Sequence, residues 1–283
     1  MNDRPVDQTD RMSGDDSNDL AAAAQAGDAA AAETLIGQVR DRIYRLTLRM
    51  VTQPSDAEDA TQEILVKILT RLSTFRGDAS FTTWAHRIAV NHLLDRQKSA
   101  VERMELTFEM YGDDLQHGLS ASPTAGPDAD LLAAEVRLSC TQAMLTCLDR
   151  EHRVAYVLGE IFEVSSDDGA YICDVPPATY RKRLSRARSR VRSFVGEHCG
   201  LINPDPAACH CSRRIDTAVS LGRINPASLQ FAAHPAHDGV AQMERLFDAA
   251  ALMRSHPTYT APHQIAETIS ALLQSGDYNL FNE

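Results

Sequence analysis

The feature that most constrains this chain is a basic stretch that begins directly after two prolines. Residues 177–192 hold seven basic side chains and no acidic one. Proline suits the first turn of a helix, where its missing N–H would have no partner, so the pair Pro176-Pro177 predicts a helix start. A helix with this charge is suited to lie against phosphates. The alternatives are a solvated surface helix and an RNA-binding stretch without sequence preference.

Apolar residues recur at helical spacing along the rest of the chain, and no strand-rich segment or internal repeat is found. Pro54 interrupts the pattern, and Ser55-Asp56-Ala57-Glu58 resembles a capping box that begins the next helix. The sequence therefore predicts an all-α fold. The apolar faces are Leu35, Ile36, Val39, Ile43, Leu46 and Met50; then Ile64, Leu65, Ile68, Leu69 and Leu72; then Phe81, Trp84, Ala85 and Ile88.

Charge and composition divide the chain into two helical domains joined by an acidic linker, with a tail before them and a helical extension after them. The net charge of −11 is concentrated in acid outside the two domains, so local fields favour an anionic partner. We predict a disordered acidic tail at 1–30, helical domains at 31–100 and 134–195, an acidic linker at 101–133 and a C-terminal extension at 196–283.

The bulk composition bounds the cellular setting. No apolar run approaches the ~20 residues needed to cross a bilayer, and the polar N-terminus does not resemble a signal peptide. We therefore expect a cytoplasmic protein without a membrane partner. Six cysteines in such a protein indicate reduced thiols or metal ligands rather than a disulfide framework.

A short helix near 166–172 and the basic helix form a candidate helix-turn-helix. In that motif the first residues of the second helix contact base edges, and later basic residues contact phosphates. The predicted DNA contacts are Pro177, Ala178, Thr179, Arg181 and Lys182 toward bases, with Arg183, Arg186 and Arg188 toward the backbone.

A second candidate nucleic-acid surface lies on the loop around Gly77 and the helix that follows it. By chemistry, arginine can hold phosphate and asparagine can read a base edge. The candidate residues are Arg76, Ser80, Phe81, Trp84, Arg87, Asn91 and Arg96. The alternative for Phe75, Phe81 and Trp84 is a purely structural role in the core.

Both segments resemble, in the right order, the DNA-binding regions of extracytoplasmic-function (ECF) sigma factors of the sigma-70 superfamily. The stretch from Arg76 to Asp95 is similar to regions 2.3 and 2.4, which melt the −10 element. Pro176, Thr179, Arg183-Leu184 and Arg186-Ala187-Arg188 are similar to region 4, which reads the −35 element.

The resemblance implies a bacterial sigma factor that binds core RNA polymerase and promoter DNA, initiates transcription and catalyses no bond change. It implies contact with the polymerase β′ coiled coil and the β subunit, and an anti-sigma factor is a candidate partner. The β′-binding residues would be Asp56, Glu58, Asp59, Gln62 and Glu63, although acids early in a helix also compensate its dipole.

The helix-turn-helix departs from the family pattern at two positions. Gly169 stands where a large aliphatic residue is usual, which costs about 1 kcal/mol of helix propensity and predicts a smaller core contact. Asp174 stands where glycine is usual in the turn, and aspartate tolerates left-handed geometry better than most residues.

The extension begins with a loop that carries nitrogen and sulfur donors. His198, Cys199, Cys209, His210 and Cys211 could supply a tetrahedral zinc site, although Cys-x-Cys is tighter than the usual spacing. The alternative is reduced thiols packing against the helix-turn-helix. Cys140, Cys147 and Cys173 are expected to be small core residues.

Two further segments of the extension are predicted to be amphipathic helices, one from Val240 to Met253 and one from Ile265 to Leu273.

Two other classes of protein compete with a sigma factor. A metal- or redox-responsive repressor would use the helix-turn-helix alone, but it would not need the segment resembling the strand-melting region. A zinc hydrolase would use the Cys/His loop, but no acid–base partner lies near that loop in sequence.

Overall fold

The computed structural model describes residues 14–51, 53–97, 105–203, 208–232 and 248–275. Within these residues the regular structure is helical, with one isolated bridge between Cys199 and Cys209, as the all-α prediction requires. None of the described helices is long and apolar enough to cross a membrane. The chain forms two compact units, and each is described by itself.

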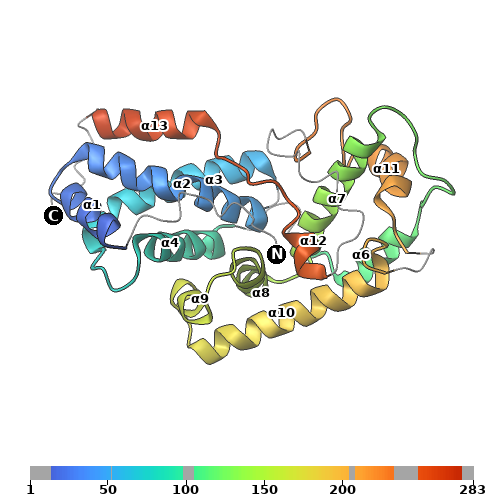
Figure 1. Ribbon diagram of the computed structural model, residues 1–283, viewed down its shortest axis with the longest axis horizontal. Helices are drawn as coiled ribbons and strands as arrows, with labels where there is room; N and C mark the ends of the chain where they lie inside the picture. Colours follow the sequence, from blue (N-terminus) through green and yellow to red (C-terminus); the bar gives the residue numbers. More distant parts are fainter. Residues whose placement is uncertain (1–13, 52, 98–104, 204–207, 233–247, 276–283) are drawn as a thin grey trace, which may run out of the picture. The chain divides into compact units, whose positions relative to one another are not determined.

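Unit 1 comprises Met1–Leu48, Ser55–Asp95 and Thr260–Glu283. Within its described residues, helices supply the core that positions the loop at 75–80 (Figure 1). Its elements are α1 (Gly14–Gln25), α2 (Ala29–Val51, whose last turn belongs to unit 2), α3 (Pro54–Thr70), η2 (Leu72–Thr74), α4 (Phe81–Asp95) and α13 (His263–Gln274).

The core of unit 1 follows the predicted apolar faces. Val39, Ile43 and Leu46 of α2 are fully buried, as are Ile64, Leu65 and Ile68 of α3. Helix α3 begins at Pro54 itself, so Ser55 lies inside the helix rather than at its cap. Proline fits that first position because the N–H it lacks would have no partner in the first turn.

The predicted disordered tail is wrong for residues 14–25, which form α1, whereas residues 1–13 lie outside the described part. Ala21 and Ala24 are buried, and α1 contacts η2 and α4. The Nε2 of Gln25 donates to the carbonyls of Leu72 and Phe75, each at 2.9 Å. Buried alanines and the amide of Gln25 therefore anchor this helix. Because α1 contains few large apolar residues, its sequence resembles that of a disordered segment.

Helix α13, the second predicted helix of the extension, packs within unit 1. Ile265 and Ile269 are buried. The backbone N–H of Ala261 donates to Asp41 at 3.1 Å, and the hydroxyl of Ser270 donates to Glu33. The extension is therefore divided between the two units, because residues 196–259 belong to unit 2.

Unit 2 comprises Arg49–Pro54 and Arg96–Tyr259. Helix α10 is its longest helix and contacts α6, α8, α9 and α12 (Figure 1). The elements are α6 (Phe108–Gln116), α7 (Ala129–Thr146), α8 (Arg150–Tyr156), η3 (Val157–Ile161), α9 (Ser166–Ile172), α10 (Pro177–His198), α11 (Cys211–Ser220) and α12 (Ala249–Met253).

The predicted linker at 101–133 is wrong in its described part, because it contains α6 and the start of α7. The side chain of Thr107 caps α6 by accepting from the N–H of Met110 at 3.2 Å. Tyr111 and Leu115 are buried, and Tyr111 stacks on Phe194 of α10 with ring centroids 5.6 Å apart. Three acidic residues of this segment, Glu109, Asp113 and Asp114, lie on α6, which packs into unit 2.

The extension also completes the core of unit 2 through α11, a helix the sequence pattern did not predict. Ile215, Ala218 and Ile224 pack with Val136 of α7 in one buried cluster. Of the predicted helix from Val240 to Met253, only α12 falls inside the described residues.

A buried carboxylate fixes the next part of the extension. Glu135 is 1% exposed and accepts backbone N–H groups from Gln230, Phe231 and Ala232 at 2.6–3.3 Å. A buried carboxylate is stable only when such donors replace its lost water. Glu135 therefore ties residues 230–232 to α7.

Candidate nucleic-acid interface

Helices α9 and α10 form the predicted helix-turn-helix. The hydroxyl of Ser165 caps α9 by accepting from the N–H of Asp168 at 3.1 Å. Asp174 adopts φ +53° in the turn, which confirms the prediction that aspartate takes the left-handed geometry here. The N–H of Val175 then donates to the carbonyl of Ala170 at 3.1 Å, and α10 begins at Pro177.

The prediction that Gly169 leaves a poorer core contact is wrong. A Cβ at this position would lie 2.2 Å from Cζ and 2.5 Å from the hydroxyl of Tyr180. The Tyr180 ring is fully buried, so it occupies the space that a larger residue at 169 would fill. Gly169 and Tyr180 thus form one contact between α9 and α10.

The first turns of α10 present a basic surface to solvent. Pro177, Ala178, Arg181, Lys182 and Arg186 are exposed, and Thr179 is half-buried. Within the described residues the structure shows no ion pair for Arg181, Lys182 or Arg186. Because the start of a helix also carries the positive end of its dipole, this surface attracts anions.

Two residues that are predicted to contact phosphate pair with carboxylates of unit 2. Arg183 lies 2.6 Å from Glu151, and Arg188 lies 2.5 Å from Glu160. These pairs join α10 to α8 and η3. Arg183 and Arg188 therefore make ion pairs within unit 2, and the contacts of all five basic residues with DNA stay predictions.

The loop at 75–80 rests on an aromatic cluster in unit 1. Phe75, Phe81 and Trp84 lie with ring centroids 5.4–5.6 Å apart. Phe81 is 1% and Trp84 9% exposed, which favours the alternative of core residues, while their contact with DNA stays a prediction. The cluster supports the loop, because apolar rings of this size are stable only when packed.

The other predicted −10 residues have different settings. Arg76 is exposed, whereas Arg87 and Asn91 on α4 are half-buried. Ser80 caps α4, since its hydroxyl accepts from the N–H of Thr83 at 3.1 Å. Arg96 lies in unit 2, where its carbonyl accepts a hydrogen bond from Arg150.

The acidic residues predicted to bind polymerase lie along one side of α3. Asp59, Gln62 and Glu63 are exposed and line a groove of about 420 Å³. Asp56 and Glu58 are half-buried, and burial, with a smaller contribution from Asp59, raises the pKa of Glu58. The exposed part of α3 is suited to a basic protein surface.

The structure does not gather the predicted Cys/His ligands. His198 packs on Phe194, with ring centroids 4.7 Å apart, and the ring of His210 lies over Gly200. Cys199, Cys209 and Cys211 instead line a cavity of unit 2. Among the residues described, no three His, Cys, Asp or Glu form a group that could hold a metal ion. Zinc binding by this loop stays a prediction.

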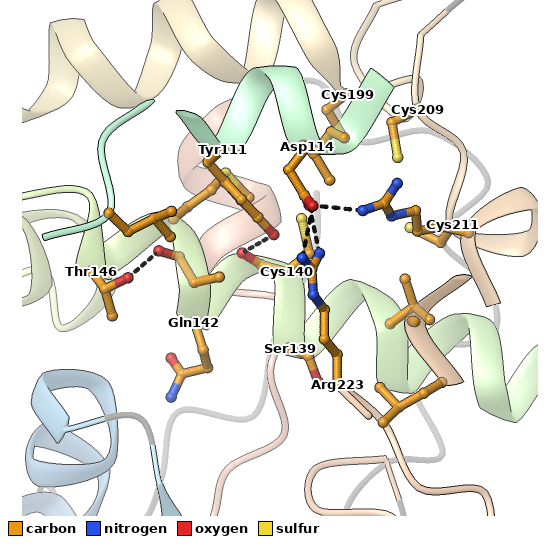
Figure 2. A pocket seen from close by; sticks show the side chains of 18 of the residues that line it. Tyr111, Asp114, Ser139, Cys140, Gln142, Thr146, Cys199, Cys209, Cys211 and Arg223 are labelled. Atoms are coloured by element: carbon orange, nitrogen blue, oxygen red, sulfur yellow. Dashed lines mark hydrogen bonds and ion pairs between the residues drawn. The ribbon is translucent and has the colours of Figure 1, made fainter. Parts of the chain in front are cut away.

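Sequence reasoning missed the fourth thiol of that cavity. Cys140, predicted to be a core residue, lies on α7 and lines the same space as the three cysteines of the extension (Figure 2). The spacing between Cys140 and these cysteines in the sequence matches no motif that would predict their proximity. The four come together through the packing of α11 against α7 and through the bridge that joins Cys199 to Cys209.

Comparison with known proteins adds independent findings. The family model described as Sigma-70 region 2 matches residues 35–102. The chain is 31% identical over 169 residues to ECF RNA polymerase sigma factor SigE of Mycolicibacterium smegmatis, covering 59% of this chain and 62% of that protein. It is 29% identical over 179 residues to the ECF RNA polymerase sigma-E factor of Escherichia coli, covering 60% of this chain and 90% of that protein.

A solved structure, that of CnrH in complex with the cytosolic domain of CnrY, matches at 21% identity. The match has a TM-score of 0.44 and covers 62% of this chain and 94% of that one.

Each unit of the chain carries one helical surface of the kind that nucleic-acid-binding proteins use. The region 2 match and these relatives make the chain similar to ECF sigma factors of the sigma-70 family. These relatives are sigma factors, and they offer no support for the repressor alternative.

Proposed function

We propose that this chain directs core RNA polymerase to promoters, using α10 for the −35 element and the 75–91 segment for the −10 element. The observation that carries this proposal is that basic residues at different positions along α10 have different partners. Its first turns expose basic groups without ion pairs, and the next turns are held by Glu151 and Glu160. A helix fixed in this way can place Arg181 and Lys182 against base edges.

The other partners follow from the same assignment. Asp59, Gln62 and Glu63 would dock on the β′ coiled coil of polymerase, and the chain would also contact the β subunit. The protein would act in the cytoplasm as a regulator rather than an enzyme, and an anti-sigma factor is a candidate partner. Zinc in the Cys/His loop is not needed for any of these roles.

Transcription by reconstituted holoenzyme tests the −35 assignment. Arg181→Ala and Lys182→Ala should each cost about 1–3 kcal/mol of discrimination at a −35-dependent promoter. Arg192→Ala is the matched control, since this exposed arginine lies eleven residues further along the same helix. It should weaken binding evenly across sequences. Wild-type −35 selectivity in both test variants would refute the assignment.

Strand opening is tested separately with permanganate on the −10 region. Asn91→Ala and Arg76→Ala should lower thymine reactivity while holoenzyme assembly is retained, because base and phosphate contacts are lost without damage to α3. Normal reactivity in both variants would remove these residues from the proposed site.

A further inference from the structure

Unit 2 contains a half-open cavity of about 700 Å³ that has no part in the proposed promoter recognition. It lies among α6, α7, α11 and the C-terminal part of α10 (Figure 2). Its volume falls within the ~300–1,000 Å³ of small-molecule sites in proteins. The extension forms much of its wall, so the segment that goes beyond the family pattern is also the segment that builds the cavity.

Sulfur-containing and aromatic side chains form a substantial part of this wall. Cys140, Cys199, Cys209, Cys211, Met110 and Met144 all line it. Tyr111, Phe194 and Phe231 add three rings. Sulfur atoms contact aromatic rings favourably, and methionine adapts its shape to an irregular ligand. The wall therefore favours a flat aromatic molecule.

The geometry of the cavity suits an organic ligand better than an ion. Metal binding requires thiolates whose sulfurs lie about 2.3 Å from one centre. The described donors do not converge in this way, and the space is far larger than an ion needs.

One side of the cavity carries excess positive charge. Both terminal nitrogens of Arg223 donate to the carboxylate of Asp114, at 2.5 and 2.7 Å, and Arg214 donates to the same carboxylate at 2.7 Å. Two guanidinium groups thus share one carboxylate. Arg223 keeps further N–H donors, since a guanidinium has five, and its side chain is 43% exposed.

We propose that this cavity binds a planar aromatic small molecule carrying one anionic group, with the rings against the sulfur-rich wall and the anion beside Arg223. Phe194 connects the site to the promoter-reading helix, because it lies on α10 itself. Through Phe194, ligand binding would couple the concentration of a small molecule to the helix that is proposed to read DNA. The binding site stands whether or not the promoter assignment does.

Two fluorescent probes of nearly the same shape test both parts of the proposal on the full chain. 1-Anilinonaphthalene-8-sulfonate carries one anion, and N-phenyl-1-naphthylamine carries none. We expect one saturable site for each probe. Ser139→Phe and Ala143→Phe fill the cavity from α7 and should weaken both probes at least tenfold. Leu131→Phe, on an exposed position of the same helix, should leave both unchanged.

Arg223→Gln separates the anion from the rings. It should weaken the sulfonate about tenfold and leave the neutral probe within twofold, and Asp114 keeps its pair with Arg214. Equal loss of both probes would refute the role of Arg223. Wild-type binding in both filling variants would place the probes elsewhere and overturn the site.

Two further measurements keep the proposal open to refutation. Hydrogen exchange of the wild-type chain should show protection of α6 and α7 by the sulfonate probe, even if a filling variant misfolds. Equimolar zinc chloride should neither raise the melting temperature nor displace the probes. If zinc does both, the cavity is an ion site and the proposal is wrong.

Discussion

Replacing Gly169 with alanine sets two physical effects against each other. Helix propensity alone predicts a gain of about 1 kcal/mol, because α9 would lose a flexible residue. The structure predicts the opposite sign. The new Cβ would lie 2.2 Å from Cζ of Tyr180, whereas carbon atoms in contact prefer about 3.5–4.0 Å. Tyr180 is fully buried, so its ring has no free space to move into.

Overpacking of this kind typically costs about 1–3 kcal/mol, and the overlap here exceeds 1 Å. With the upper end of that range, about 3 kcal/mol, less the propensity gain of about 1 kcal/mol, we expect Gly169→Ala to lower the free energy of unfolding of unit 2 by about 2 kcal/mol. Gly196→Ala is the matched control on α10, because a Cβ there meets nothing within 4 Å. That variant should be neutral or slightly stabilised.

Urea unfolding followed by far-ultraviolet circular dichroism measures the difference, and hydrogen exchange of α9 and α10 localises it. Trp84 is the single tryptophan of the chain and belongs to unit 1, so its fluorescence should not change. In a Tyr180→Leu background the same glycine substitution should become favourable. If Gly169→Ala stabilises the wild-type chain as Gly196→Ala does, the steric argument is wrong.

Two other predictions concern the attachment of the extension to unit 2. Glu135→Ala should destabilise unit 2 by about 2–3 kcal/mol, because the N–H groups of residues 230–232 lose their charged acceptor; unchanged exchange of those amides would contradict this. Arg223 holds the pKa of Asp114 below its ordinary value of 3.8. That contribution is present above the unfolded pKa and is lost as pH falls through the folded pKa, so acid unfolding followed below pH 4 should be less steep in Asp114→Asn.

Local pattern was enough to predict the helix-turn-helix. Pro177 begins α10 as expected, and Asp174 takes the left-handed geometry that its short polar side chain permits. The core faces of α2 and α3 could also be predicted from the sequence, because their buried residues recur every three or four positions.

Elements held by long-range contacts were not predicted. Helix α1 depends on Gln25 reaching the carbonyls of Leu72 and Phe75, and α6 depends on Tyr111 stacking against Phe194. Their acid-rich or alanine-rich composition resembles that of a flexible segment. The position of Cys140 beside the other thiols could not be predicted for the same reason, since only tertiary packing places α7 beside the extension.

The assignment of α13 to unit 1 also bears on how the chain folds as it is made. Residues 29–95 of unit 1 leave the ribosome long before His263, which follows Asp95 by 168 residues. At about 5–20 residues per second, the gap is roughly 8–34 s. During that time the surface of α2 that later receives α13 is uncovered, and a chaperone or another nascent chain can occupy it. Completion of the first domain is thereby deferred to the end of synthesis.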